Sequence, residues 1–102
     1  MTIYSYTKGR PYVYKCTEKK TGRFYIGYRY KYYNNPEDDL GKKYFTSNKY
    51  VKNNFHNFDF EIVAVFNNKK DALDFEGQLI RETQSDLQIN YDRIKKLQSR
   101  YL

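Results

Sequence analysis

The segment from Pro11 to Arg29 reads PYVYKCTEKKTGRFYIGYR and decides the fold that we expect. Its two ends, residues 11–17 and 23–29, are rich in Tyr, Phe, Val and Ile, which favour β-strands. The polar residues 18–22 separate them and end in a glycine. Two β-rich runs joined by a short glycine-containing turn predict an antiparallel hairpin.

Farther along the chain, a strand and a helix are predicted in succession. Residues 58–66 (FDFEIVAVF) begin with alternation and end in a continuous apolar run, which predicts a strand at the centre of the sheet. Asn68 is expected to cap a helix over about 69–84, where apolar residues recur with helical spacing. A short extended piece over 87–91 and a last helix over about 92–101 complete the expected elements.

Between the hairpin and that strand the hydrophobic pattern is weaker. Residues 30–43 show no hydrophobic period and are interpreted as an ordered loop. Residues 46–55 resemble a short helix that Thr46 or Ser47 would cap. The complete order predicts an α+β fold, a small and mainly antiparallel sheet flanked by helices. The length of 102 residues predicts one domain, spanning 1–102.

Composition favours an anionic partner. The net charge is +7, and 13 tyrosines supply rings that can pack in a core or stack on bases. Nucleic acid is the first candidate, and a solvated lysine-rich surface is the alternative that charge alone leaves open. With one Cys and one His, a disulfide or a Cys/His metal cluster is excluded within the chain. His56 is expected in an exposed turn.

The chain contains neither a signal-like apolar run at its start nor a stretch near the roughly 20 apolar residues that span a membrane. We therefore expect a cytoplasmic protein without a membrane partner.

Glu76 stands out on the predicted helix over 69–84. It follows Leu73 by three positions and precedes Ile80 by four, so it shares the apolar side of the helix. A carboxylate there is costly without a cation or metal as a partner. The alternative is an edge position from which the side chain reaches solvent.

Two short motifs now point to a family. Tyr12-Val13-Tyr14 and Tyr25-Ile26-Gly27 are separated by 25 − 14 = 11 positions from Tyr to Tyr, and a helix, an apolar strand, Glu76 and Asn90 follow in order. Over about residues 11–92 this set resembles the GIY-YIG endonucleases, in particular phage and homing-endonuclease members. The chain departs from the family in having Tyr-Val-Tyr for Gly-Ile-Tyr and no arginine between Arg29 and Arg81.

The resemblance implies a DNA-cleaving enzyme with a single Mg²⁺ or Mn²⁺ in the cytoplasm of a bacterial host or phage-infected cell. Tyr14 would be the general base for water, its pKa lowered by a bound metal and by Arg29 or nearby lysines, and Tyr25 would hydrogen-bond near the same point. Arg29 would bind the scissile phosphate, Glu76 would ligate the metal, and Asn90 would orient the site.

Five lysines would contact the DNA, and the first three are also alternatives to Arg29: Lys31, Lys42, Lys43, Lys49 and Lys52. No segment remains for a separate DNA-reading domain, so specificity would be low or come from a homo-oligomer or a partner protein. A noncatalytic nucleic-acid-binding module is the rival function, favoured by the basic and aromatic run YRYKYY at 28–33. Taken singly, the tyrosines are better explained as core residues, Arg29 as a surface cation and Asn90 as a turn residue. Their joint spacing with Glu76 favours the nuclease.

Overall fold

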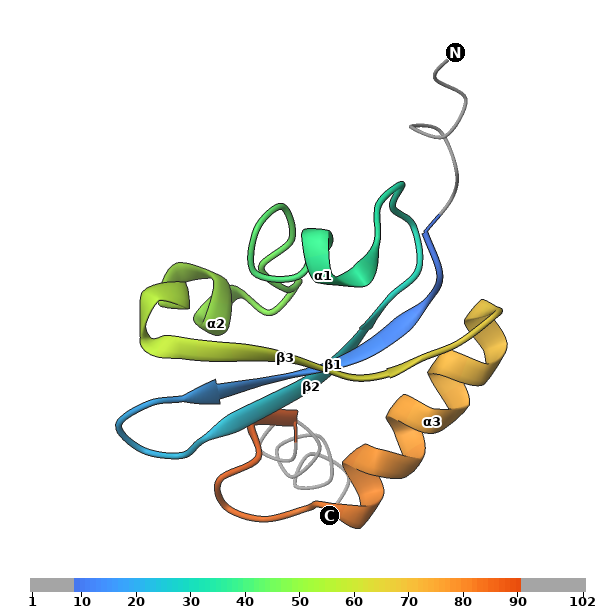
Figure 1. Cartoon of the computed structure of the whole chain (residues 1–102). Helices are drawn as coiled ribbons and strands as arrows, with labels where there is room; N and C mark the ends of the chain where they lie inside the picture. Colours follow the sequence, from blue (N-terminus) through green and yellow to red (C-terminus); the bar gives the residue numbers. More distant parts are fainter. Residues whose placement is uncertain (1–8, 91–102) are drawn as a thin grey trace.

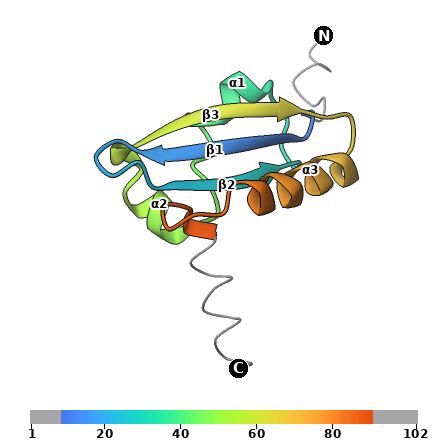
Figure 2. The same ribbon diagram turned by 90° about the horizontal axis from the view of Figure 1, so that it is seen from below.

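Three strands form one antiparallel sheet in the computed structural model, which describes residues 9–90. β1 (Tyr12–Glu18) lies between β2 (Phe24–Arg29) and β3 (Phe58–Val65), as Figure 2 shows. β1 and β2 are the predicted hairpin, with Tyr14 opposite Gly27 and Cys16 opposite Tyr25. The α+β class and all three predicted strands are confirmed.

The prediction that residues 58–66 form the central strand is wrong, because β1 holds that position. A central strand must be covered on both faces, and β1 is: its first three residues, Tyr12, Val13 and Tyr14, are fully buried. In β3, exposed and less exposed side chains alternate, and Asp59, Glu61 and Val63 are the exposed ones. This pattern is expected of an edge strand with one face toward solvent.

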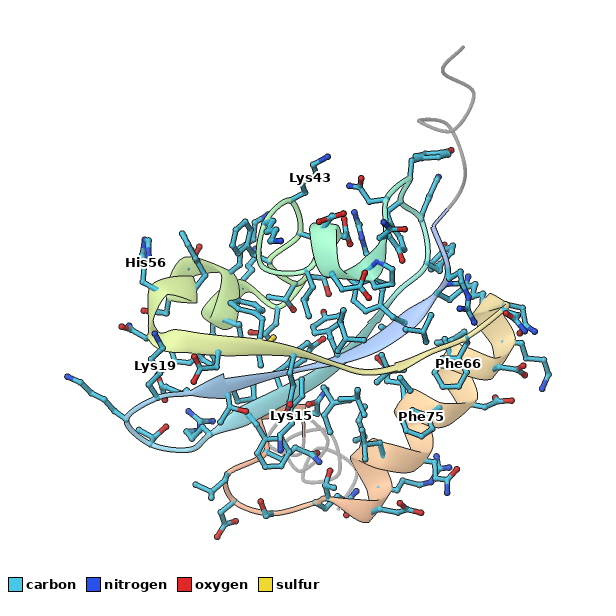
Figure 3. All side chains as sticks on the ribbon, viewed as in Figure 1. Lys15, Lys19, Lys43, His56, Phe66 and Phe75 are labelled. Carbon is cyan, nitrogen blue, oxygen red and sulfur yellow. The ribbon has the colours of Figure 1, made fainter. Side chains whose placement is uncertain are left out.

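Different helices cover the two faces of the sheet. Figure 1 shows α1 (Pro36–Asp39) and α2 (Lys49–Asn53) on one side and α3 (Lys69–Glu82) on the other. On the α1 and α2 side the buried residues form the larger core: Tyr12, Tyr14, Cys16, Tyr32, Leu40, Val51 and Phe58. On the α3 side they are Val13, Ile26 and Ala72. Figure 3 shows Phe66 and Phe75 on this second side, where their ring centroids lie 5.3 Å apart.

The predictions for residues 30–43 and 46–55 need correction. The expected loop over 30–43 contains α1, a single helical turn. It begins at Pro36, whose ring fixes φ near the helical value. α2 is shorter than the predicted 46–55 and continues into the 3₁₀ turn η2 (Phe55–Asn57). Its cap is Asn48, whose side chain accepts the Val51 N–H at 3.1 Å, rather than Thr46 or Ser47.

α3 is capped by Asn68 as predicted, with the Asp71 N–H donated to the Asn68 side chain at 2.9 Å. The extended piece after it is reduced to one bridge between Phe24 and Gln88, because residues 89 and 90 are already helical. The predicted helix over 92–101 lies outside the described residues. Within residues 9–90, none of the helices is both long and apolar enough to cross a membrane.

Candidate active site

Tyr14 lies at the centre of a cluster of hydroxyl groups on the α1 and α2 side of the sheet. Its hydroxyl oxygen is 2.8 Å from Thr46 Oγ1 and 3.1 Å from the Tyr44 hydroxyl. The Tyr44 ring meets the Tyr14 ring edge-on, with centroids 5.6 Å apart. The loop that leads into α2 therefore delivers two hydroxyl partners to a phenol that β1 supplies.

Gly27 explains how the Tyr14 side chain reaches across β2. The two residues face each other in the hairpin, and an ideal Cβ on Gly27 would lie 2.5 Å from Tyr14 Cζ. The phenol thus crosses β2 at a residue without a side chain. This gives the glycine of the Tyr25-Ile26-Gly27 motif a steric reason.

Tyr25 is a half-buried neighbour of Tyr14 on the same face, with ring centroids 6.4 Å apart. Burial raises the pKa of its phenol, a hydrogen bond with Ser47 lowers it, and the charge of Glu76 raises it again. The Glu76 carboxylate therefore lies within electrostatic reach of Tyr25, although α3 covers the opposite face. The structure thus places Tyr14 and Tyr25 side by side on one face of the hairpin, while Glu76 lies on the helix that covers the other face.

Arg29 joins the cluster through an aromatic contact and an ion pair. Its guanidinium carbon lies 4.1 Å from the Tyr44 ring centroid. Its Nε and Nη2 donate to Asp39 at 3.0 and 3.3 Å, and the buried Asp39 also accepts the Tyr12 hydroxyl at 2.6 Å. Nη1 makes no hydrogen bond within the described part of the chain, so one edge of the fixed guanidinium is left for a ligand.

A groove of about 310 Å³ runs beside Arg29. Its lining combines two cations with aromatic rings and a hydroxyl: Tyr28, Arg29, Tyr30, Lys31, Tyr44 and Ser47. A second groove, of about 400 Å³, shares Tyr30 and is lined otherwise by residues 9–11 and 67–69. Arg10 and Lys69 give this second groove its positive charge, and its lining contains no acidic residue.

Glu76 is a half-buried carboxylate without a hydrogen bond or ion pair to any residue in the range 9–90. Burial raises its pKa to about 7. The described residues contain no group of three Asp, Glu, His or Cys that would hold a metal ion by themselves. A lone carboxylate such as Glu76 could hold a cation only where water and ligand oxygens complete the coordination shell.

Asn90 faces the backbone of β2 rather than the hydroxyl cluster. Its side-chain oxygen accepts the Ile26 N–H, and its side-chain nitrogen donates to the Ile26 carbonyl, both at 2.8 Å. The Asn90 amide thus hydrogen-bonds both the N–H and the carbonyl of Ile26, which lies between Tyr25 and Gly27. Its part in the site is to hold that stretch of β2 in place.

In the free protein, without a metal, the surroundings of Tyr14 raise the pKa of its phenol. Burial is the largest influence and raises the pKa of this phenol, as does Tyr44, while the hydrogen bond with Thr46 lowers it. Arg29 is paired with Asp39, which offsets the positive charge that Tyr14 was expected to feel. Tyr14 is consequently protonated in the free protein.

The five lysines expected to bind DNA are all exposed. Lys31 lines the groove beside Arg29, and Lys42 pairs loosely with Asp38 at 3.7 Å. Figure 3 shows Lys43 pointing away from the sheet, while Lys49 and Lys52 lie on α2. His56 is also exposed and points away from the sheet, on η2, as expected (Figure 3).

Sequence reasoning missed four residues of the cluster: Asp39, Tyr44, Thr46 and Ser47. The acidic run at 37–39 was visible, but only the fold selects Asp39 for burial beside Arg29. Tyr44 lies just after the segment without a hydrophobic period, and the sequence predicts Thr46 and Ser47 only as possible helix caps.

Comparison of the chain with models of protein families, with curated proteins and with solved structures finds no match.

Proposed function

We propose that this protein is a divalent-metal-dependent endonuclease of the GIY-YIG type, which hydrolyses phosphodiester bonds in DNA. The observation that carries the proposal is the convergence of Tyr14, Tyr25 and Arg29 on one face of the hairpin, with Glu76 within electrostatic reach of Tyr25. With Asn90, these are the five positions to which the motif resemblance assigns a role in the reaction.

Arg29 is suited to hold the scissile phosphate. The ion pair with Asp39 and the contact with Tyr44 fix the plane of the guanidinium and leave Nη1 unpaired among the described residues. A planar, pre-oriented guanidinium forms directed hydrogen bonds to phosphate oxygens. Because Asp39 offsets part of its charge, Arg29 acts mainly through these bonds, and Lys31 adds charge to the same groove.

Tyr14 begins the reaction as a phenol, since burial keeps it protonated. It can accept a proton from water only when positive charge comes close to its oxygen and favours the phenolate. Substrate binding would draw that charge in, and the phenol would then release its own proton to solvent. The water oxygen bonds to phosphorus as one water proton passes to the Tyr14 phenolate. The phosphorus–oxygen bond to the leaving group breaks, and the leaving oxygen takes a proton from solvent.

Glu76 would hold the Mg²⁺ or Mn²⁺. When bound, the cation would supply positive charge at the phosphate and support the leaving oxygen. The carboxylate itself gains from a cation, because a half-buried carboxylate without a partner is costly in its ionised form.

The two grooves mark a path for the DNA strand. Both are lined by Tyr30, whose ring stacks on Tyr28 with centroids 5.8 Å apart and an angle of 9° between the planes. Lys31 adds positive charge to the groove beside Arg29, and Arg10 and Lys69 give positive charge to the second groove. A strand whose scissile phosphate lies at Arg29 would thus keep contact with cations as it passes Tyr30.

A supercoiled-plasmid assay with Mg²⁺, Mn²⁺ or excess chelator tests the proposal. Glu76→Ala and Tyr14→Phe are each expected to lower the cleavage rate at least about 100-fold while DNA binding persists. Glu82→Ala is the matched control, because Glu82 is exposed on the same helix and bonds only to Gln78. Wild-type cleavage in excess chelator, or full activity of Glu76→Ala, would rule out the metal role.

The rival function, a noncatalytic nucleic-acid-binding module, is favoured by the same basic grooves and the Tyr28–Tyr30 stack. Both functions predict binding that weakens with salt, so binding alone does not separate them. Strand scission that requires Glu76 identifies the nuclease. Tight binding by pure wild-type protein without scission in any metal identifies the binding module.

A further inference from the structure

Thr46 has a backbone conformation that threonine rarely adopts. Its φ is +86°, and within residues 9–90 it is the one non-glycine residue with a positive φ. A β-branched side chain makes this left-handed region costly, and glycine is the residue that enters it freely. Strain of this kind persists where the surrounding structure imposes it, and it is concentrated at functional sites.

The strained conformation places the Thr46 hydroxyl against Tyr14. Thr46 is buried, and its Oγ1 lies 2.8 Å from the Tyr14 hydroxyl oxygen. The same Oγ1 accepts the Asn48 N–H at 3.3 Å. A hydroxyl has one hydrogen, and this second bond leaves that hydrogen available for the Tyr14 oxygen.

A purely structural role does not account for threonine here. The turn before α2 needs a positive φ, and glycine would supply it without strain, as it does at Gly22 and Gly41. The α2 cap is provided by Asn48, and the Thr46 side chain adds to that turn only the long 3.3 Å bond from the Asn48 N–H. What threonine adds is a hydroxyl group directed at a buried phenol.

We propose that Thr46 is a positioning residue for Tyr14: its hydroxyl fixes the phenol oxygen in place and donates a hydrogen bond to it as Tyr14 takes a proton from water. This inference rests on the proposed nuclease function. The bond favours the charged form of Tyr14, in keeping with the direction in which Thr46 moves the pKa of this phenol.

Three substitutions at Thr46 in the full chain separate the hydroxyl from the backbone strain. Thr46→Gly removes the hydroxyl and relieves the strain, Thr46→Val removes the hydroxyl and keeps the branched shape, and Thr46→Ser keeps the hydroxyl. Plasmid cleavage in Mg²⁺ is measured across pH for each variant, together with its thermal unfolding.

We expect Thr46→Gly and Thr46→Val to cleave roughly tenfold more slowly than wild type, the effect of one lost hydrogen bond. The rising limb of the pH–rate profile should move to higher pH in both, because the phenol loses a donor. Thr46→Ser should keep most of the rate, and Thr46→Gly should unfold within about 4 °C of wild type. Wild-type rates in Thr46→Gly, or equal losses in all three variants, would overturn the proposal.

A second measurement does not depend on cleavage. In protein carrying ¹³C at tyrosine Cζ, the Tyr14 resonance is identified by its loss in Tyr14→Phe. It should move in Thr46→Gly and Thr46→Val and stay close to its wild-type position in Thr46→Ser. If the wild type does not cut DNA but this pattern holds, the proposed function fails while the Thr46–Tyr14 contact stands. An unmoved resonance in all three variants refutes the contact itself.

Discussion

Replacing Gly27 with alanine would place a methyl group against the phenol ring of Tyr14. An ideal Cβ at this position lies 2.5 Å from Tyr14 Cζ and 3.0 Å from Cε1, whereas non-bonded carbons settle at about 3.5–4.0 Å. The ring would therefore have to retreat by about 1 Å. Tyr14 is fully buried, so the movement would also stretch its 2.8 Å hydrogen bond with Thr46.

The expected cost follows from these two effects. Overpacking of this kind costs about 1–3 kcal/mol, and the lost hydrogen bond adds about 1 kcal/mol, for a total of about 2–4 kcal/mol. For a chain of this size that loss lowers Tm by roughly 8–30 °C. DNA cleavage by the fraction that stays folded should fall as well, because the Tyr14 hydroxyl is displaced.

Denaturation by urea and by heat, followed by circular dichroism, measures the loss. Gly77→Ala is the matched control, since a Cβ there meets only the flexible end of Arg81 at 3.3 Å. It lies inside α3 and should stabilise the protein by about 0.5–1 kcal/mol. In a Tyr14→Val background, the cost of Gly27→Ala should shrink by at least about 1 kcal/mol, because the ring is gone. A Gly27→Ala protein as stable as wild type would refute the steric argument.

Three further variants examine charge and hydrogen bonding around the site. Burial raises the pKa of Glu76 from 4.5 to about 7, so the folded chain binds more protons than the unfolded chain between those values and loses stability as pH rises through them. Glu76→Gln should remove that slope and be more stable than wild type at pH 8 but not at pH 4.5 in urea denaturation; equal stability at both values would contradict the burial of this carboxylate. Arg29→Ala leaves the buried Asp39 carboxylate without its cation and should cost about 3–5 kcal/mol of unfolding free energy, with a negligible loss arguing that water reaches Asp39. Asn90→Ala removes two hydrogen bonds to the Ile26 backbone, so the stability should fall by about 1–2 kcal/mol, and amide exchange at Ile26 should accelerate; unchanged exchange would count against this anchoring role.

Much of the secondary structure could be predicted because its signals are local. The hairpin was visible in two β-rich runs around a glycine-containing turn, and α3 was visible in its helical spacing and its cap, Asn68. Residues a few positions apart determine these features, so no knowledge of distant contacts was needed. The helix prediction also placed Glu76 on the apolar side of α3, where the structure half-buries it.

The order of the strands was not local information. Residues 58–66 have the strongest apolar run, but a sheet places at its centre the strand that both faces can cover. That strand is β1, because Tyr12 and Tyr14 face one layer while Val13 faces α3. Only the packing of distant segments selects between two strands of similar hydrophobicity.

By itself, the sequence determined the α+β class, the hairpin that carries Tyr14 and Tyr25, and the helix that carries Glu76. The tertiary structure alone decided which groups surround Tyr14. Tyr44 and Thr46 lie 30 and 32 positions from it, between the segment 30–43, which has no hydrophobic period, and α2. No pattern within one element can predict such contacts, because they form only when the loop closes over the completed sheet and packs its side chains against β1.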